Sequence, residues 1–187
     1  MNLGLLAGLA GLTMLLPTGA PAAADGDIAW QHRVRQDAVT LTANPLGTAS
    51  RTAFYIGRGF TEAAIQPYAL ACGFSFGMQN GGRHALATRL ADWYAVGADN
   101  RRIKLRLPES WSAEWAKAGV PPAARIAFKW AQFQADNTFE PGDWIMGMAT
   151  LETAPVAPFR IVARYQVAGN HKENHEIVLD KLACAND

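Results

Sequence analysis

Bulky apolar side chains occupy every second position in several separate segments of this chain, and this period of two restricts its fold more than any other feature. The clearest segment is 102–107, where Ile103, Leu105 and Leu107 alternate with three cationic residues. A strand with this pattern buries one face and exposes the other, which is typical of antiparallel sheets. The sequence therefore predicts a mainly β protein, either an antiparallel β-sandwich or an open barrel, with one or two short helices.

Other segments define the expected order of elements. In 70–78, large side chains alternate with alanine, glycine and serine, which predicts a central strand with a thin outer face. Residues 125–151 are expected to form one hairpin around a turn at 140–143, and residues 159–183 a second hairpin. The remaining expectations are strands at 28–34 and 53–57, a helix over 110–118, one helical turn at 61–66, and either helix or strand over 83–95.

The N-terminus has the pattern of a secretory signal peptide. Residues 1–24 carry no charged side chain, and an apolar run over 3–16 precedes small residues that end at Ala24. This run is shorter than the roughly 20 apolar residues that span a bilayer. We expect cleavage after Ala24, a periplasmic or secreted location, and a mature chain, 25–187, that forms a single β-rich globular domain without a transmembrane segment. The alternative is a buried N-terminal helix, which the two prolines of this segment disfavour.

Cys72 and Cys184 are the two cysteines of the chain. In an oxidising compartment, a single pair is most simply one disulfide. Such a bond would tie the C-terminal end of the chain to its middle. The alternatives are two buried thiols or a reactive pair, and the sequence contains no Cys-x-x-Cys motif that would indicate redox catalysis.

The charge balance excludes some functions and leaves one local feature. Lys and Arg number 17 against 16 Asp and Glu, a net charge of +1, which argues against nucleic-acid binding. Arg102, Lys104 and Arg106 nevertheless lie on one face of a predicted strand. One interpretation is that this basic strip binds phosphate, anionic lipid or an acidic protein. The alternative is that it is an ordinary solvated sheet face.

Gly73-Phe74-Ser75-Phe76-Gly77 resembles the Gly-x-Ser-x-Gly nucleophile elbow of the α/β-hydrolase family. The resemblance implies Ser75 as nucleophile, Asp143 as the acid, and His171 or His175 as the base. It covers only this motif, and the downstream part of the chain is predicted to form hairpins instead of alternating strands and helices. The alternative interpretation places Gly73, Ser75 and Gly77 on the thin face of a strand.

Metal and carbohydrate sites are weaker hypotheses. His171 and His175 have the i,i+4 spacing of a metal site, but Lys172 and Asn174 replace the glutamate that the known motifs require, so we expect a solvated loop, no metal and no cofactor. The chain contains six tryptophans. One interpretation is that some of them form a platform on which a sugar stacks, and the alternative is that most of them fill the core. The pair expected to be partly exposed is Trp111 and Trp115.

The sequence favours an exported, non-enzymatic binding or interaction domain that acts on an envelope, secretion or inhibitory partner, which would be another protein or an envelope component. A small secreted serine hydrolase that uses Ser75 is the first alternative. The second is a β-barrel that binds a small apolar ligand, with a lining that includes Phe74, Phe76, Met78, Trp130 and Met146.

Overall fold

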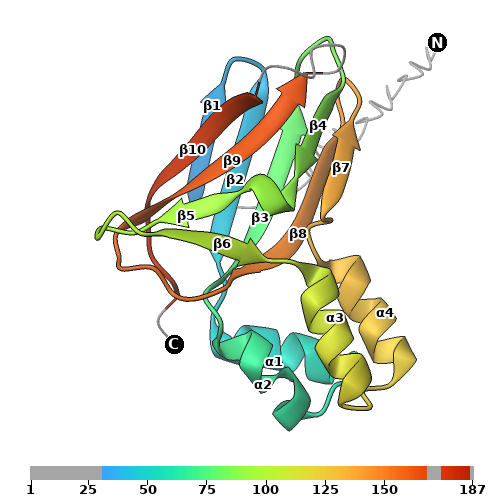
Figure 1. Cartoon of the computed structure of the whole chain (residues 1–187). Helices are drawn as coiled ribbons and strands as arrows, with labels where there is room; N and C mark the ends of the chain where they lie inside the picture. Colours follow the sequence, from blue (N-terminus) through green and yellow to red (C-terminus); the bar gives the residue numbers. More distant parts are fainter. Residues whose placement is uncertain (1–30, 168–173, 186–187) are drawn as a thin grey trace, which may run out of the picture.

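The computed structural model describes residues 31–167 and 174–185. These residues form mainly antiparallel β structure with four short helices, as the sequence predicts for the class of fold, although the expected number of helices was one or two. Figure 1 shows the strands as one curved body with the helices gathered at one end. The predicted signal peptide, 1–24, and its cleavage site at Ala24 lie outside the described residues.

The strands make one open sheet. Along the hydrogen-bonded path their order is β1-β2-β3-β8-β6-β5-β9-β4-β7, and β10 pairs with the other edge of β9. Every pairing between these strands is antiparallel. The strands are β1 (His32–Gln36), β2 (Val39–Pro45), β3 (Gly73–Asn80), β4 (Leu86–Arg89), β5 (Tyr94–Val96), β6 (Arg102–Arg106), β7 (Asp136–Phe139), β8 (Trp144–Leu151), β9 (Phe159–Val167) and β10 (Asn174–Leu182).

The bulky sides of the strands enclose the main core, as the alternation predicts. On β3, Phe74, Phe76 and Met78 are buried, whereas Ser75 points to the opposite, thin face. The rings of Phe76 and Trp93 meet edge to face, with centroids 5.7 Å apart. Inward side chains of β2, β6, β8, β9 and β10 add to this core.

The helices bury a second, aromatic cluster against the outer face of β8. Tyr55, Tyr68 and Phe128 contact one another through their rings. The Tyr55 hydroxyl lies 3.5 Å from the Met148 sulfur, and the Trp111 indole donates to Thr150 Oγ1 at 3.1 Å. The helices are α1 (Thr48–Ile56), α2 (Glu62–Leu70), α3 (Pro108–Lys117), α4 (Pro122–Ala131) and the 3-10 turn η1 (Leu90–Asp92).

Two strand predictions were wrong because helices replace them. Residues 53–57, expected as a strand, mostly belong to α1, and residues 126–130 belong to α4, so residues 125–151 are not one hairpin. The turn at 140–143 is present, with the Asp143 N–H donating to the Glu140 carbonyl at 3.0 Å. However, the strands on its two sides do not pair with each other: β7 pairs with β4, and β8 pairs with β3.

Other predictions were confirmed. The hairpin over 159–183 is present as β9 and β10, and the helix over 110–118 is α3. The ambiguous segment 83–95 contains β4, η1 and the start of β5. No described helix is long and apolar enough to cross a membrane.

The structure contains the predicted disulfide. Cys72 and Cys184 are bonded, with their Cα atoms 5.2 Å apart. Cys72 directly precedes β3 and Cys184 follows β10, so the bond joins the middle of the chain to its C-terminal segment.

Candidate functional site: a cationic sheet face

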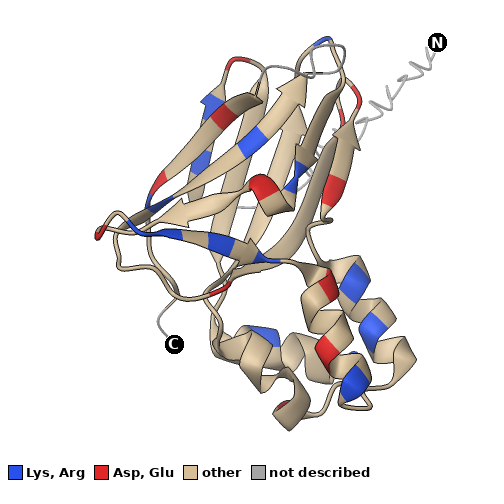
Figure 2. Ribbon diagram, viewed as in Figure 1, with Lys and Arg blue, Asp and Glu red and all other residues tan. Residues whose placement is uncertain are grey.

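Strand β6 directs its cationic residues away from the core. Ile103 and Leu105 are buried, whereas Arg102 and Lys104 are exposed on the opposite side of the strand. Figure 2 shows basic residues along β6 and again on β9. The period of two in this segment therefore creates a charged outer surface above an apolar core.

The register of three neighbouring strands enlarges this surface. Val96 of β5 lies between Arg102 of β6 and Arg160 of β9. Neighbouring strands are about 4.8 Å apart, so the backbones of the two arginines are about 10 Å apart and their long side chains are able to converge on one ligand. We call Arg102, Lys104, Arg160, Arg164 and the Tyr94 ring between them the cationic face.

An open hollow of about 560 Å³ lies on the cationic face. Val96 and Val162 belong to its floor and are buried although they point away from the main core. The stems of long basic side chains cover apolar surface in this way while their charges stay in water. The lining consists of Tyr94, Val96, Asn100, Arg102, Arg160, Val162, Glu176, Val178 and Asp180.

Tyr94 organises two of the arginines. The Arg102 guanidinium carbon lies 4.7 Å from the centroid of the Tyr94 ring, and that of Arg164 lies 5.3 Å from it. Arg164 also donates two hydrogen bonds to Glu176, at 2.8 and 2.7 Å, and this carboxylate raises the pKa of the Arg164 guanidinium. Glu176 thus neutralises Arg164 locally. Within the described residues, Arg102 contacts the Tyr94 ring and has no carboxylate partner.

The cationic face carries an excess of positive charge. The side chains of Lys104 and Arg160 make no ion pair within the described parts of the chain. The carboxylates at this surface are Glu176, which Arg164 neutralises, and Asp180 at the edge of the hollow. On the cationic face, three cations therefore remain against one carboxylate. Two of them, Arg102 and Arg160, line the hollow, where an anionic group of a ligand would find several donors.

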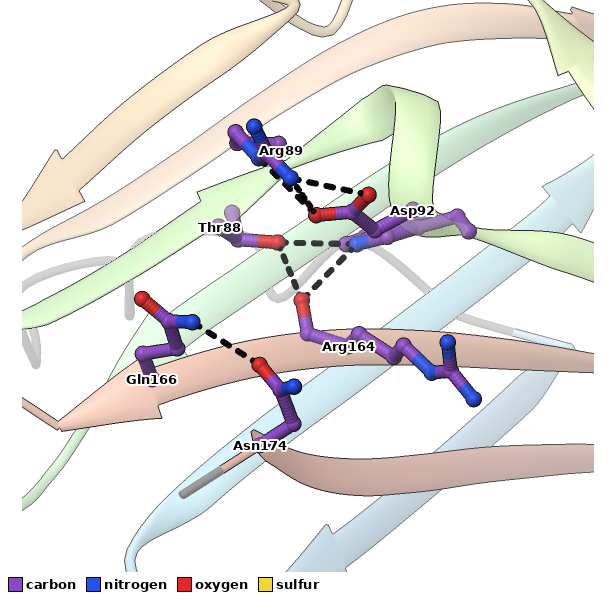
Figure 3. A network of polar contacts seen from close by, with 7 residues as sticks. Thr88, Arg89, Asp92, Arg164, Gln166 and Asn174 are labelled. Atoms are coloured by element: carbon purple, nitrogen blue, oxygen red, sulfur yellow. Dashed lines mark hydrogen bonds and ion pairs between the residues drawn. The ribbon is translucent and has the colours of Figure 1, made fainter. Parts of the chain in front are cut away.

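A buried hydrogen-bond junction holds this surface in place (Figure 3). β9 pairs first with β5 and then with β4, and the Arg164 carbonyl lies where the neighbour changes. This carbonyl accepts from Thr88 Oγ1 at 2.6 Å and from the Trp93 indole nitrogen at 3.2 Å. The Thr88 hydroxyl in turn accepts from the same indole at 2.8 Å. The junction satisfies a carbonyl that would otherwise be left without a strand partner.

Two polar pairs flank the junction in Figure 3. Arg89 binds both carboxylate oxygens of Asp92, at 2.9 and 3.1 Å, across the turn η1. Gln166 donates to Asn174 at 2.8 Å between β9 and β10. Arg89 is therefore compensated by Asp92 and does not add to the charge excess of the cationic face.

Arg106, the third residue of the predicted basic strip, has a different environment from Arg102 and Lys104. It forms an ion pair with Glu114 of α3, and its guanidinium carbon lies 3.5 Å from the centroid of the Trp111 ring. Arg106 thus joins the sheet to the helices, and the predicted strip is continuous only from Arg102 to Lys104.

The expectation that Trp111 and Trp115 are partly exposed was wrong. They are 3% and 4% exposed and stack in the helical cluster with ring centroids 5.6 Å apart. The Trp115 indole also donates to the Ala64 carbonyl at 2.9 Å. The helices bury this pair against one another, so it offers no platform to a ligand.

The structure gives no support to the hydrolase alternative. Ser75 lies in the middle of β3, between Asn44 of β2 and Met148 of β8, and not at a strand-to-helix elbow. Asp143 accepts from the Glu140 N–H in a turn, and His175 stacks on Tyr165 with centroids 5.2 Å apart. His171 lies outside the described residues.

Gly73 and Gly77 lie on the thin face of β3, and Gly73 has a packing role there. A side chain at Gly73 would place a Cβ atom 2.3 Å from the Arg51 guanidinium, so Arg51 occupies the space beside this glycine. Gly77 accepts a hydrogen bond from the Thr42 hydroxyl through its carbonyl at 3.1 Å. The motif is thus part of a packed strand.

The residues predicted to line an apolar ligand cavity do not meet in one. Phe74, Phe76 and Met78 fill the main core, whereas Trp130 and Met146 are exposed on the outside of the molecule. Sequence alternation placed the first three residues well. Trp130 was misplaced because its segment is helical.

No group of three His, Cys, Asp or Glu side chains able to hold a metal ion occurs in the described residues. Tyr94, Arg160 and Arg164 also belong to the cationic face, although no sequence motif predicted them there. Arg160 and Arg164 stand out as the polar half of the 159–167 alternation, but the sequence contains no signal that places β9 beside β5.

The fold and the site define an open antiparallel β protein with a cationic outer face. No protein-family model matches the chain, and no curated protein matches it in sequence. Among solved structures, it is similar to the yjhA protein from Bacillus subtilis, with 9% identity, 81% of this chain and 98% of that chain covered, and a TM-score of 0.43.

Two further solved structures are similar over comparable lengths. A functionally unknown protein from Listeria monocytogenes EGD-e shares 10% identity, with 82% of each chain covered and a TM-score of 0.41. A DUF4426 family protein from Pseudomonas aeruginosa PAO1 shares 8% identity, with 82% of this chain and 95% of that chain covered and a TM-score of 0.35.

Proposed function

We propose that this protein is an exported, non-enzymatic binding domain that recognises an acidic segment of a partner protein through its cationic face. The observation that carries this proposal is that Arg102 and Arg160 line one hollow, with Lys104 opposite the lining residue Tyr94 on the neighbouring strand. None of these three cations has an ion-pair partner among the described residues. Charged groups arranged in this way attract and orient a partner of opposite charge.

The composition of the cationic face favours a protein over a lipid surface or a polyanion. Tyrosine and arginine are the residues enriched at protein interfaces, and Tyr94 contacts two arginines here. Glu176 and Asp180 lie beside the cations. Because Arg164 neutralises Glu176, a uniformly anionic surface would be repelled at Asp180, whereas a protein segment with patterned charges is able to avoid or complement this carboxylate.

The chemistry of the cationic groups favours binding over catalysis. Guanidinium and ammonium groups in water stay protonated at physiological pH, so they hold charge instead of transferring protons. The guanidinium groups of Arg102 and Arg160 also suit carboxylates because they are planar donors that bind two oxygens at once.

Two features support export of the domain. The uncharged N-terminal segment ends in a signal-peptidase pattern at Ala24, and the bond between Cys72 and Cys184 suits an oxidising compartment. The partner would therefore be a protein of the periplasm, the envelope or the extracellular space.

The test measures the affinity of the mature protein for a synthetic glutamate-rich decapeptide by isothermal titration calorimetry at two salt concentrations. We expect affinity that weakens with added salt, and a loss of about tenfold or more in the double variant Arg102→Glu/Arg160→Glu, which corresponds to at least ~1.4 kcal/mol. The matched control is Arg33→Glu/Arg35→Glu, which reverses the charge of two exposed arginines on β1 and should retain affinity.

Two results would overturn the proposal. One is equal affinity of the double variant and the wild-type protein for the peptide. The other is binding to phosphatidylglycerol vesicles that depends on Arg102 and Arg160 while the peptide is ignored, which would assign the cationic face to a membrane.

A further inference from the structure

A groove beside helix α4 is separate from the cationic face. The buried side of α4 contributes Phe128 to the helical cluster. Its opposite side presents Ile126 and Trp130, one turn apart and 58% and 81% exposed. The groove has a volume of about 530 Å³, within the range of small-molecule sites. Its lining comes from the start of α3, from α4 and from the connection to β7, namely Pro108, Glu109, Ile126, Lys129, Trp130, Gln132, Gln134, Ala135 and Asp136.

The base of this groove is held in position by hydrogen bonds. The Gln132 amide donates to the Tyr55 hydroxyl at 2.6 Å and accepts from the Tyr68 hydroxyl at 3.1 Å. Burial raises the pKa of both tyrosines, so these hydroxyls stay neutral. The Phe133 N–H donates to the Met148 carbonyl at 2.8 Å, which attaches the connection to β8. A ligand would therefore meet a surface that needs little ordering.

The edge of the groove carries polar groups without partners. The carboxylates of Glu109 and Asp136 make no hydrogen bond or ion pair within residues 31–167 and 174–185, and the same holds for the side-chain amide of Gln134. Groups of this kind are free to accept hydrogen bonds from a ligand. They lie in the same lining as a nearly fully exposed indole ring.

The exposed indole and the unpartnered carboxylates together restrict the kind of ligand that this groove is able to bind. A purely apolar partner would cover Glu109 and Asp136 without satisfying them, which is costly. An anion would be repelled by both carboxylates. A cation would be attracted by them and repelled by the ammonium group of Lys129 in the same lining, so a cationic ligand is the comparison that the test must include. A neutral ring with an apolar face and hydroxyl groups at its edge matches both features of the lining, because it covers the exposed indole and donates hydrogen bonds to the two carboxylates.

We propose that this groove binds a neutral oligosaccharide, with one pyranose ring stacked on Trp130 and its hydroxyls donating to the carboxylates of Glu109 and Asp136. The apolar C–H face of the sugar covers the exposed indole, and Ile126 extends the apolar surface. This site is independent of the cationic face, because the two linings share no residue.

The test uses cellotetraose and tetra-N-acetylchitotetraose as probes, with tetralysine as a cationic comparison, in saturation-transfer NMR and calorimetric titrations of the mature protein. We expect at least one of the two sugars to bind, and Trp130→Ala to weaken that binding by about tenfold or more. Trp130→Phe should retain part of the affinity because it keeps an aromatic face. Glu109→Gln should weaken binding less than Trp130→Ala does.

Trp144→Ala is the matched control, since Trp144 is a second exposed tryptophan, 60% exposed, on β8 and outside the groove lining. It should bind sugar like the wild type. The proposal is overturned if neither sugar binds, if tetralysine alone binds, or if Trp144→Ala loses as much affinity as Trp130→Ala. A thermal melt of each variant checks that the surface substitutions leave the fold intact.

Discussion

Thr88 has two hydrogen-bonding functions with one hydroxyl group. It accepts from the Trp93 indole and donates to the Arg164 carbonyl, in a buried position where β9 changes neighbours. Its loss would leave a buried donor without one partner and a buried carbonyl with a single, longer bond. The geometry of Tyr94 and Arg164 at the cationic face depends on this junction.

We therefore predict that Thr88→Val, which keeps the shape and removes the hydroxyl, lowers the free energy of unfolding by about 1–3 kcal/mol. Urea denaturation followed by tryptophan fluorescence measures this change. Thr138→Val on β7 is the control, because Thr138 is exposed. Equal effects of the two substitutions would show that the hydroxyl network adds no stability.

Tyr55 and Tyr68 make stability depend on pH in the alkaline range. Burial raises the pKa of both phenols above the ordinary value of 10.0, so the folded state keeps them neutral while the unfolded chain ionises them. The unfolded state then binds fewer protons than the folded state, and stability falls as pH rises.

We predict that the free energy of unfolding is unaffected by these groups below about pH 9 and declines above about pH 10. Denaturation at successive pH values tests this, with Tyr55→Phe as the comparison. Tyr55→Phe should make the alkaline decline shallower, although it loses the hydrogen bond to Gln132. An identical alkaline decline in the variant would contradict the assignment.

At the scale of elements, the joint between the helices and the sheet depends on Gly147 of β8. A Cβ atom at this position would lie 2.2 Å from the Phe133 nitrogen, where the connection after α4 crosses the strand. Only a residue without a side chain allows this approach, which also carries the hydrogen bond from Phe133 to Met148.

We predict that Gly147→Ala lowers the free energy of unfolding by about 1–3 kcal/mol, because backbone atoms must move to admit the methyl group. Gly57→Ala is a suitable control: it has helical dihedral angles, and its nearest contact would be an ordinary 3.6 Å. Thermal unfolding of both variants measures the difference. Wild-type stability of Gly147→Ala would contradict the close approach of Phe133 to Gly147.

Alternation of apolar residues in the sequence predicts strands well, but it fails where a helix also carries apolar residues at every second position. Ile126, Phe128 and Trp130 are every second residue, yet in α4 they lie on different sides, with Phe128 buried and the other two exposed. Pro122 at the first turn and the alanines around it are helix signals that the alternation masked. Three isolated positions do not separate a period of 2 from a period of 3.6.

At the scale of the whole molecule, the cationic face is a product of topology. Tyr94 and Val162 are cross-strand neighbours although they are far apart in sequence. The alternation predicts that Arg102 and Lys104 point outward, but it contains no information on which strand lies beside β5. The half of the site on β6 was therefore predictable, and the half on β9 was not.

The disulfide acts on the whole chain as well. It closes a loop with a sequence separation of 112, and the loop-entropy model assigns a closed loop of this size about 4–5 kcal/mol. We predict that Cys72→Ser/Cys184→Ser lowers the free energy of unfolding by about 2–5 kcal/mol, measured by urea denaturation. The wild-type protein, unfolded without reductant, should release no free thiol. Two titratable thiols per chain would contradict the bond.

The most direct measurement of the central claim is mapping of backbone amide shifts by NMR during titration with the glutamate-rich decapeptide. We predict that the largest saturable shifts occur at Tyr94, Val96, Arg102 and Arg160, and that they vanish in Arg102→Glu/Arg160→Glu. Shifts that instead concentrate on the helices or on β1, or that persist in the double variant, would contradict the assignment of the cationic face as the recognition surface.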